Sequence, residues 1–253
     1  MKDSSDLFRN KFISPPTGVY NESGEEGDTM VRHIDSELQQ LKDLALQMGG
    51  YVEKAFEASM KMVTAKDTNA FHEVERFESR INELQIAIDE ACVAVLAKQA
   101  PVAKDLRLVI AITKINTDLE RMGDQSINIA LATQDLFGAW PQTNLPAQVS
   151  KMITEVRGMV RSVLDAFARR DVELSQKVLE LDDQVDALKD ELIGEMTRKM
   201  KSEKDQIEVG LAIIMIAKNL ERLADHATNI AEEVIYLATG NDVRHGHSVP
   251  VNS

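Results

Sequence analysis

Apolar residues recur at three- and four-residue steps along most of the chain, which is the period of one face of an α-helix. Six such stripes are present, at residues 29–63, 68–97, 101–137, 146–169, 171–200 and 204–239. Strand and turn signals are almost absent, so we predict an all-α fold. Short connections between long helices make sequential neighbours antiparallel. The pattern therefore predicts six long antiparallel helices.

The segment at residues 138–146 contains two prolines, a glycine and no apolar period, and we interpret it as a linker. This boundary divides the chain into a first three-helix unit at residues 29–137 and a second at residues 147–240. Residues 1–28 are rich in Ser, Gly, Pro and acidic residues, so they are predicted to form a flexible N-terminal tail. Residues 241–253 are predicted to form a polar C-terminal tail.

The two halves resemble each other in sequence. LERMGDQSINIA at residues 119–130 aligns with LERLADHATNIA at residues 220–231, and seven of the twelve positions are identical. Upstream, residues 67–84 align with residues 171–188. A tandem duplication is the simplest explanation, and it predicts two three-helix bundles of one architecture.

The charge and composition exclude several classes of partner. A formal net charge of −13 disfavours a duplex-DNA binder, because phosphate contacts require a basic face, so no nucleic-acid partner is expected. The single cysteine, Cys92, excludes an internal disulfide and agrees with a reducing cytoplasm. The first residues lack the apolar stretch of a secretory signal. The longest apolar run, residues 209–217, is about half of a membrane span, so membrane contact is expected only through protein partners.

Acidic pairs spaced four residues apart recur at equivalent places in the two halves. Residues at this spacing share one face of a helix, roughly 6 Å apart. The pairs, with one Asn substitution, are Glu120 with Asp124, Glu221 with Asp225, Glu78 with Asn82, and Asp182 with Asp186. Asn128 and Asn229 extend the rows of the third and sixth helices by one turn. Arg121 and Arg222 follow the first carboxylate of those rows, either as ion-pair partners or as cations beside a metal or a partner.

Antiparallel packing would bring three or four acidic groups together in each half. Their repulsion is relieved by protonation or by cations, and hard ions such as Mg²⁺, Mn²⁺, Ca²⁺ or Fe³⁺ prefer oxygen ligands. No Cys or His pair has zinc-site spacing, and the Glu-x-x-His element of ferritin-like di-iron bundles is absent. The competing interpretation is a solvated acidic face that holds no ion. Duplication of the pattern favours a functional face.

The runs IDEACVAVLAKQAPVAKDLRLVIAITK and LERMGDQSINIA, with LERLADHATNIA in the second half, closely resemble the PhoU family of accessory regulators of bacterial phosphate transport. The likeness covers residues 30–240. The family pattern E(D)-x-x-x-D falls on the pairs that begin at Glu120, Glu221 and Asp182. It departs at Asn82, where an amide replaces the second carboxylate and leaves that site one charge short.

The resemblance implies a cytoplasmic six-helix homodimer that binds metal ions, with Mg, Mn or Fe expected. It also implies a non-enzymatic adaptor that links the phosphate ABC transporter ATPase to a sensor histidine kinase and represses the phosphate-starvation response when phosphate is plentiful. Two alternatives stay open: a carboxylate-bridged metal-dependent enzyme, and a metal-storage or structural protein. The absence of a nucleotide loop, a nucleophile–base pair and a phosphate clamp counts against the enzyme.

Overall fold

The computed structural model describes residues 33–244, and this part of the chain contains six long helices and no strand. The helices are α1 (His33–Ala65), α2 (Phe71–Gln99), α3 (Ala103–Ala139), α4 (Ala147–Arg169), α5 (Val172–Ser202) and α6 (Ile207–Thr239). Single 3₁₀ turns, η2 (Thr68–Ala70) and η3 (Lys204–Gln206), precede α2 and α6. The all-α prediction is confirmed. None of these helices is long and apolar enough to cross a bilayer.

The helix ends agree closely with the apolar stripes. The third helix begins at Ala103, two residues later than predicted, because Val102 has extended backbone angles. Asp171 accepts a hydrogen bond from the Leu174 amide at the start of α5, and its counterpart Asp67 caps η2 in the same way through the amide of Asn69. The duplicated Asp thus caps α5 in the second half and the 3₁₀ turn that leads into α2 in the first. The predicted tail at residues 1–28 lies outside the described residues.

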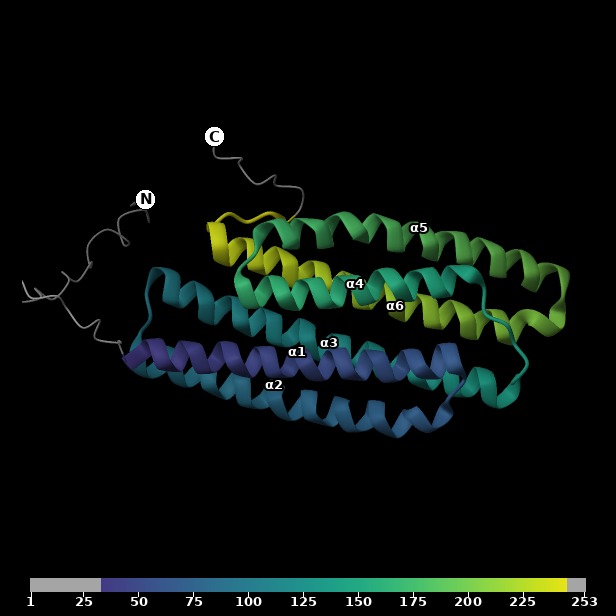
Figure 1. Cartoon of the computed structure of the whole chain (residues 1–253), viewed down its shortest axis with the longest axis horizontal. Coiled ribbons are helices and arrows are strands. Elements are labelled where there is room, and N and C mark those ends of the chain that lie inside the picture. Colours follow the sequence, from purple (N-terminus) through teal and green to yellow (C-terminus); the bar gives the residue numbers. More distant parts are fainter. Residues whose placement is uncertain (1–32, 245–253) are drawn as a thin grey trace, which may run out of the picture. The chain divides into compact units, whose positions relative to one another are not determined.

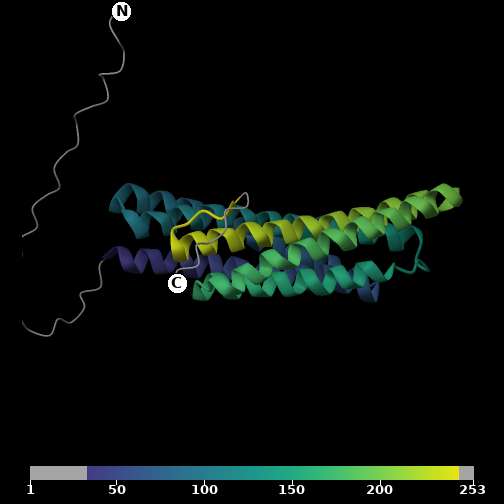
Figure 2. The same cartoon turned by 90° about the horizontal axis from the view of Figure 1, so that it is seen from above.

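The helices pack as two antiparallel three-helix bundles, α1–α3 and α4–α6 (Figure 1). The main contact between the bundles is made by α3 and α6, which lie alongside each other in both views (Figures 1 and 2). One continuous hydrophobic cluster passes through both bundles and includes Phe56, Leu119, Val160 and Leu220. The six helices therefore share a single core.

The small residue Gly123 allows α3 to approach α2 closely. A Cβ atom at Gly123 would lie 2.9 Å from Cδ1 of Ile81, a fully buried residue of α2. The corresponding residues of the second half are Ala224 and Val185, both buried, so a larger residue on the third helix accompanies a smaller one on the second. Volume is thus conserved between the halves at the positions that lie between the acidic residues.

We predict that Gly123 and Ile81 are energetically coupled. Ile81→Val alone should lower the free energy of unfolding by about 1 kcal/mol, because it leaves a cavity. In a Gly123→Ala background the same change should cost nothing, since it removes the Cδ1 atom that the new methyl group would meet. Urea denaturation of the two single variants and the double variant should give a coupling free energy of about 1 kcal/mol. Additive effects would contradict this packing.

Candidate metal centres

The first acidic cluster lies between α2 and α3. The Asn82 amide on α2 donates a hydrogen bond to Glu78 Oε1 at 2.5 Å. On α3, Arg121 approaches Glu120 Oε2 and Asp124 Oδ2, each at 3.5 Å. Burial raises the pKa of Glu120, and the negative charges of Asp124 and Glu78 raise it further. Glu120 Oε2 is buried and accepts no hydrogen bond, which leaves a carboxylate oxygen available to a cation.

The second acidic cluster lies between α5 and α6, at the equivalent place in the other bundle. Asp182 and Asp186 come from α5, and Glu221 and Asp225 come from α6. Burial raises the pKa of Asp225 to about 6, and the charges of Glu221, Asp182 and Asp186 contribute to the rise. Burial followed by the charge of Asp186 also raises the pKa of Asp182. The four carboxyl groups therefore act on one another across the helix pair.

A lysine that the sequence did not single out reaches the second cluster. Lys189 Nζ donates hydrogen bonds to Glu221 Oε1 at 2.8 Å and to Asp186 Oδ1 at 2.9 Å. Its side chain is 16% exposed, and these two bonds raise its pKa. A basic residue three positions after an acidic one is common on solvated helices, so the spacing gave no sign of a contact with a second helix.

The donor set fits hard cations in chemistry, because both clusters offer carboxylate oxygens and the first adds an amide oxygen. Among residues 33–244, however, no three His, Cys, Asp or Glu side chains are arranged to hold one ion. The structure therefore brings the expected residues to shared helix faces, without grouping three of their oxygens around one point. An ion would have to gather these oxygens by rotation of the side chains.

The residues expected to extend the acidic rows lie between the two bundles. Asn229 of α6 donates a hydrogen bond to Asp118 Oδ1 of α3, and His226 Nδ1 lies 2.9 Å from the same oxygen. Asn128 and Arg222 line a groove between α3 and α6. Each four-residue step turns about 40° past a full helical turn, so the third member of a row leaves the face of the first. Arg222 differs in position from Arg121, which lies beside Glu120 and Asp124.

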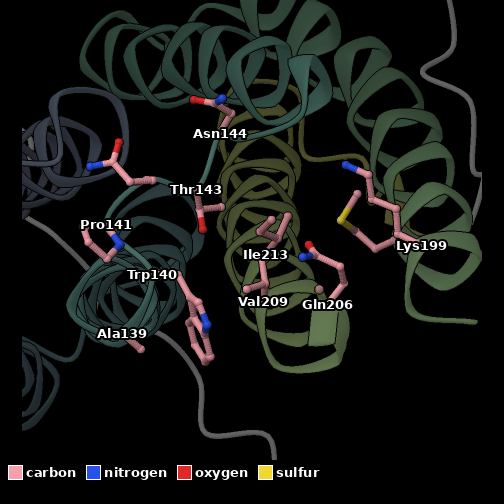
Figure 3. A pocket seen from close by; sticks show the side chains of 12 residues that line it. Ala139, Trp140, Pro141, Thr143, Asn144, Lys199, Gln206, Val209 and Ile213 are labelled. Carbon is pink, nitrogen blue, oxygen red and sulfur yellow. The ribbon is translucent and has the colours of Figure 1, made fainter. Parts of the chain in front are cut away.

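A pocket of about 530 Å³ lies away from both clusters. Trp140 and Thr143, from the segment between α3 and α4, line one side, and Val209 and Ile213 of α6 line the other (Figure 3). Lys199 of α5 reaches its rim. None of the lining residues is acidic, so this pocket offers no carboxylate ligand for a hard cation.

We predict that Asp225 destabilises the metal-free protein at neutral pH. Its folded-state pKa of about 6 lies above the ordinary value of 3.8, so the folded state binds the proton more tightly than the unfolded state. The favourable contribution of Asp225 to the free energy of unfolding is therefore complete below about pH 4, and it is lost as the pH rises through 6. Asp225→Asn should be more stable than the parent at pH 7 in EDTA, by about 1 kcal/mol after solvent screening, and equal to it at pH 4.

Urea denaturation at both pH values measures this difference. Asp165→Asn, an exposed residue of α4, is the matched control and should show the same difference from the parent at pH 4 and pH 7. A loss of stability in Asp225→Asn at pH 7 would show that the carboxylate is not strained by its neighbours.

Comparison with known proteins identifies the family of the chain. The model of the PhoU domain matches twice, at residues 45–133 and 149–234, once in each bundle. The phosphate-specific transport system accessory protein PhoU homolog of Pseudomonas putida is 36% identical over 222 residues, which cover 86% of this chain and 87% of that protein. The PhoU protein of Escherichia coli is 30% identical over 212 residues, or 84% and 88% of the two chains.

Two solved structures share the fold. The crystal structure of PhoU from Pseudomonas aeruginosa matches with a TM-score of 0.80 and 35% identity, over 83% of this chain and all of that one. The phosphate transport system regulatory protein PhoU from Streptococcus pneumoniae matches with a TM-score of 0.77 and 30% identity, over 83% and 99% of the two chains. These relatives are named accessory or regulatory proteins, which confirms the expectation of a non-enzymatic family. With two matches to the family model and this agreement in fold, the chain belongs to the PhoU family.

Proposed function

We propose that this protein is an accessory regulator of phosphate transport that binds metal ions on its acidic clusters and acts through contacts with protein partners. The observation that carries the proposal is the occurrence of an equivalent acidic cluster in each bundle of a PhoU-family chain. The relatives' names refer to the phosphate transport system, which supports a role in phosphate transport. The acidic cluster is repeated in both bundles, which supports a function that uses an equivalent acidic face in each bundle.

The residues that would hold metal are those of the two clusters: Glu78, Asn82, Glu120 and Asp124 in the first, and Asp182, Asp186, Glu221 and Asp225 in the second. A bound Mg, Mn or Fe ion supplies positive charge that relieves carboxylate repulsion and presents further coordination positions to oxygen ligands of a partner. The raised pKa values of Glu120 and Asp225 support this proposal. They show that burial and the repulsion from neighbouring carboxylates disfavour the charged form of both groups, which a bound cation would favour.

The proposed partners are the ATPase of a phosphate ABC transporter and a sensor histidine kinase. In this scheme the protein is a cytoplasmic homodimer that meets the membrane only through these proteins. When phosphate is plentiful, it links the state of the transporter to the kinase and represses the phosphate-starvation response. Family membership supports this scheme, and the net charge of −13 agrees with protein partners in place of nucleic acid.

We predict that Asp124→Asn combined with Asp225→Asn derepresses phosphate-responsive transcription in phosphate-rich medium. The two substitutions remove one carboxylate charge from each cluster and keep the shape of the side chain. The loss of repression should therefore match that of a deletion strain. A reporter under phosphate control, together with recovery of the transporter ATPase and the kinase by affinity purification from membranes, provides the measurement. Glu180→Gln, an exposed position on α5, is the control and should repress normally.

Two results would contradict the proposal. If the deletion strain keeps normal phosphate-responsive transcription, the protein has a storage or structural role. If folded parent protein recovers neither partner from membranes of phosphate-replete cells, the adaptor role fails.

A further inference from the structure

The ammonium group of Lys189 lies where the charges of the second cluster meet. It contacts one carboxylate from each helix, Glu221 of α6 and Asp186 of α5, at 2.8 and 2.9 Å. Asp190 Oδ1 lies 3.8 Å away on the exposed side. With 16% of the side chain exposed, this is a largely buried cation that joins α5 to α6. Lys189 thus occupies one oxygen of Glu221 and one of Asp186, two of the carboxylates that would hold a metal ion.

The first cluster is arranged differently. The alignment of residues 67–84 with 171–188 places neutral Gln85 opposite Lys189. The cation beside the first cluster is Arg121, which contacts Glu120 and Asp124 of its own helix at 3.5 Å and is 55% exposed. Such long, exposed contacts contribute little to stability and are easily broken. An entering ion therefore meets weaker competition at the first cluster than at the second.

The number of carboxylates alone would favour metal binding at the second cluster. It has four carboxylates, whereas the first has three because Asn82 replaces the fourth. While the two basic residues stay in place, Lys189 cancels one charge of the second cluster and leaves three, and Arg121 cancels one charge of the first and leaves two. An ion that uses Glu221 and Asp186 must also replace two short charge-assisted hydrogen bonds, which are stronger than neutral ones.

We propose that Lys189 is a built-in competitor for metal at the second cluster, so that the first cluster loads at a lower metal concentration and the second loads only as Lys189 moves out. This inference rests on the proposed metal-binding function. When the ion binds, it takes the oxygens of Glu221 and Asp186, and the displaced ammonium group becomes exposed on α5. The protein then has two metal thresholds, and crossing the second adds an exposed positive charge to its surface.

Mn²⁺ titration of the full-length protein by calorimetry tests the order of loading. We expect two classes of site, the tighter lost in Asp124→Asn and the weaker lost in Asp225→Asn. Lys189→Gln should tighten the weaker class about tenfold, equivalent to about 1.4 kcal/mol, and leave the tighter class unchanged. Gln85→Lys should weaken the tighter class. Lys177→Gln, an exposed lysine of α5, removes the same charge and should change neither affinity.

Lysine acylation mapped by mass spectrometry tests the displacement of Lys189 in the parent protein. Because this experiment uses no substitution, a folding defect in a variant cannot affect its result. Lys189 should react slowly without metal and several-fold faster at Mn²⁺ concentrations that fill the weaker class. Unchanged reactivity during filling, or unchanged affinities in Lys189→Gln, would overturn the inference while leaving metal binding intact. If the parent and every variant bind no Mn²⁺ at millimolar concentration, the metal-binding part of the proposed function fails, and this inference fails with it.

Discussion

Packing of the helices over a shared apolar core, which brings carboxylates of neighbouring helices together, is the interaction on which the rest of this structure depends. The apolar stripes require α2 to pack against α3, and α5 against α6, over a shared core. The close contact of Gly123 with Ile81 lies within the same helical turns as the first acidic cluster. Packing of these helices removes carboxyl groups from water and also holds like charges together. Burial first, and repulsion second, raises the pKa values of Glu120, Asp182 and Asp225. In the function we propose, a bound cation relieves the cost of this burial and repulsion.

The two bundles balance this charge in different ways. In the first, an exposed arginine from the same helix approaches its carboxylates, and in the second a largely buried lysine joins the two helices. The α3–α6 contact places both clusters in one body, and the bonds of His226 and Asn229 to Asp118 tie the helices together between them. In the function we propose, the duplicated fold therefore provides two cation sites that differ in strength, and this difference would give a graded response to metal.

Much of this architecture could be predicted from the sequence. The helical period and the single proline-rich linker predicted six helices, and the repeat of LERMGDQSINIA predicted two equivalent bundles. The acidic faces followed from four-residue spacing. Contacts between bundles could not be predicted, because periodicity shows that a face is apolar and not which helix covers it. The hydrogen bond from Asn229 to Asp118 depends on the contact between the bundles. The reach of Lys189 to Glu221 depends in the same way on how α5 packs against α6 within the second bundle.

The central claim is that positive ions relieve repulsion at two equivalent acidic clusters. Anomalous diffraction from crystals grown with millimolar Mn²⁺, from protein never exposed to chelator, tests it most directly. The account predicts peaks within about 2.5 Å of carboxylate oxygens at Glu120 and Asp124, and at Glu221 and Asp186 once Lys189 has moved aside. Crystals without a peak at either cluster, with these carboxylates turned into bulk water, would contradict it.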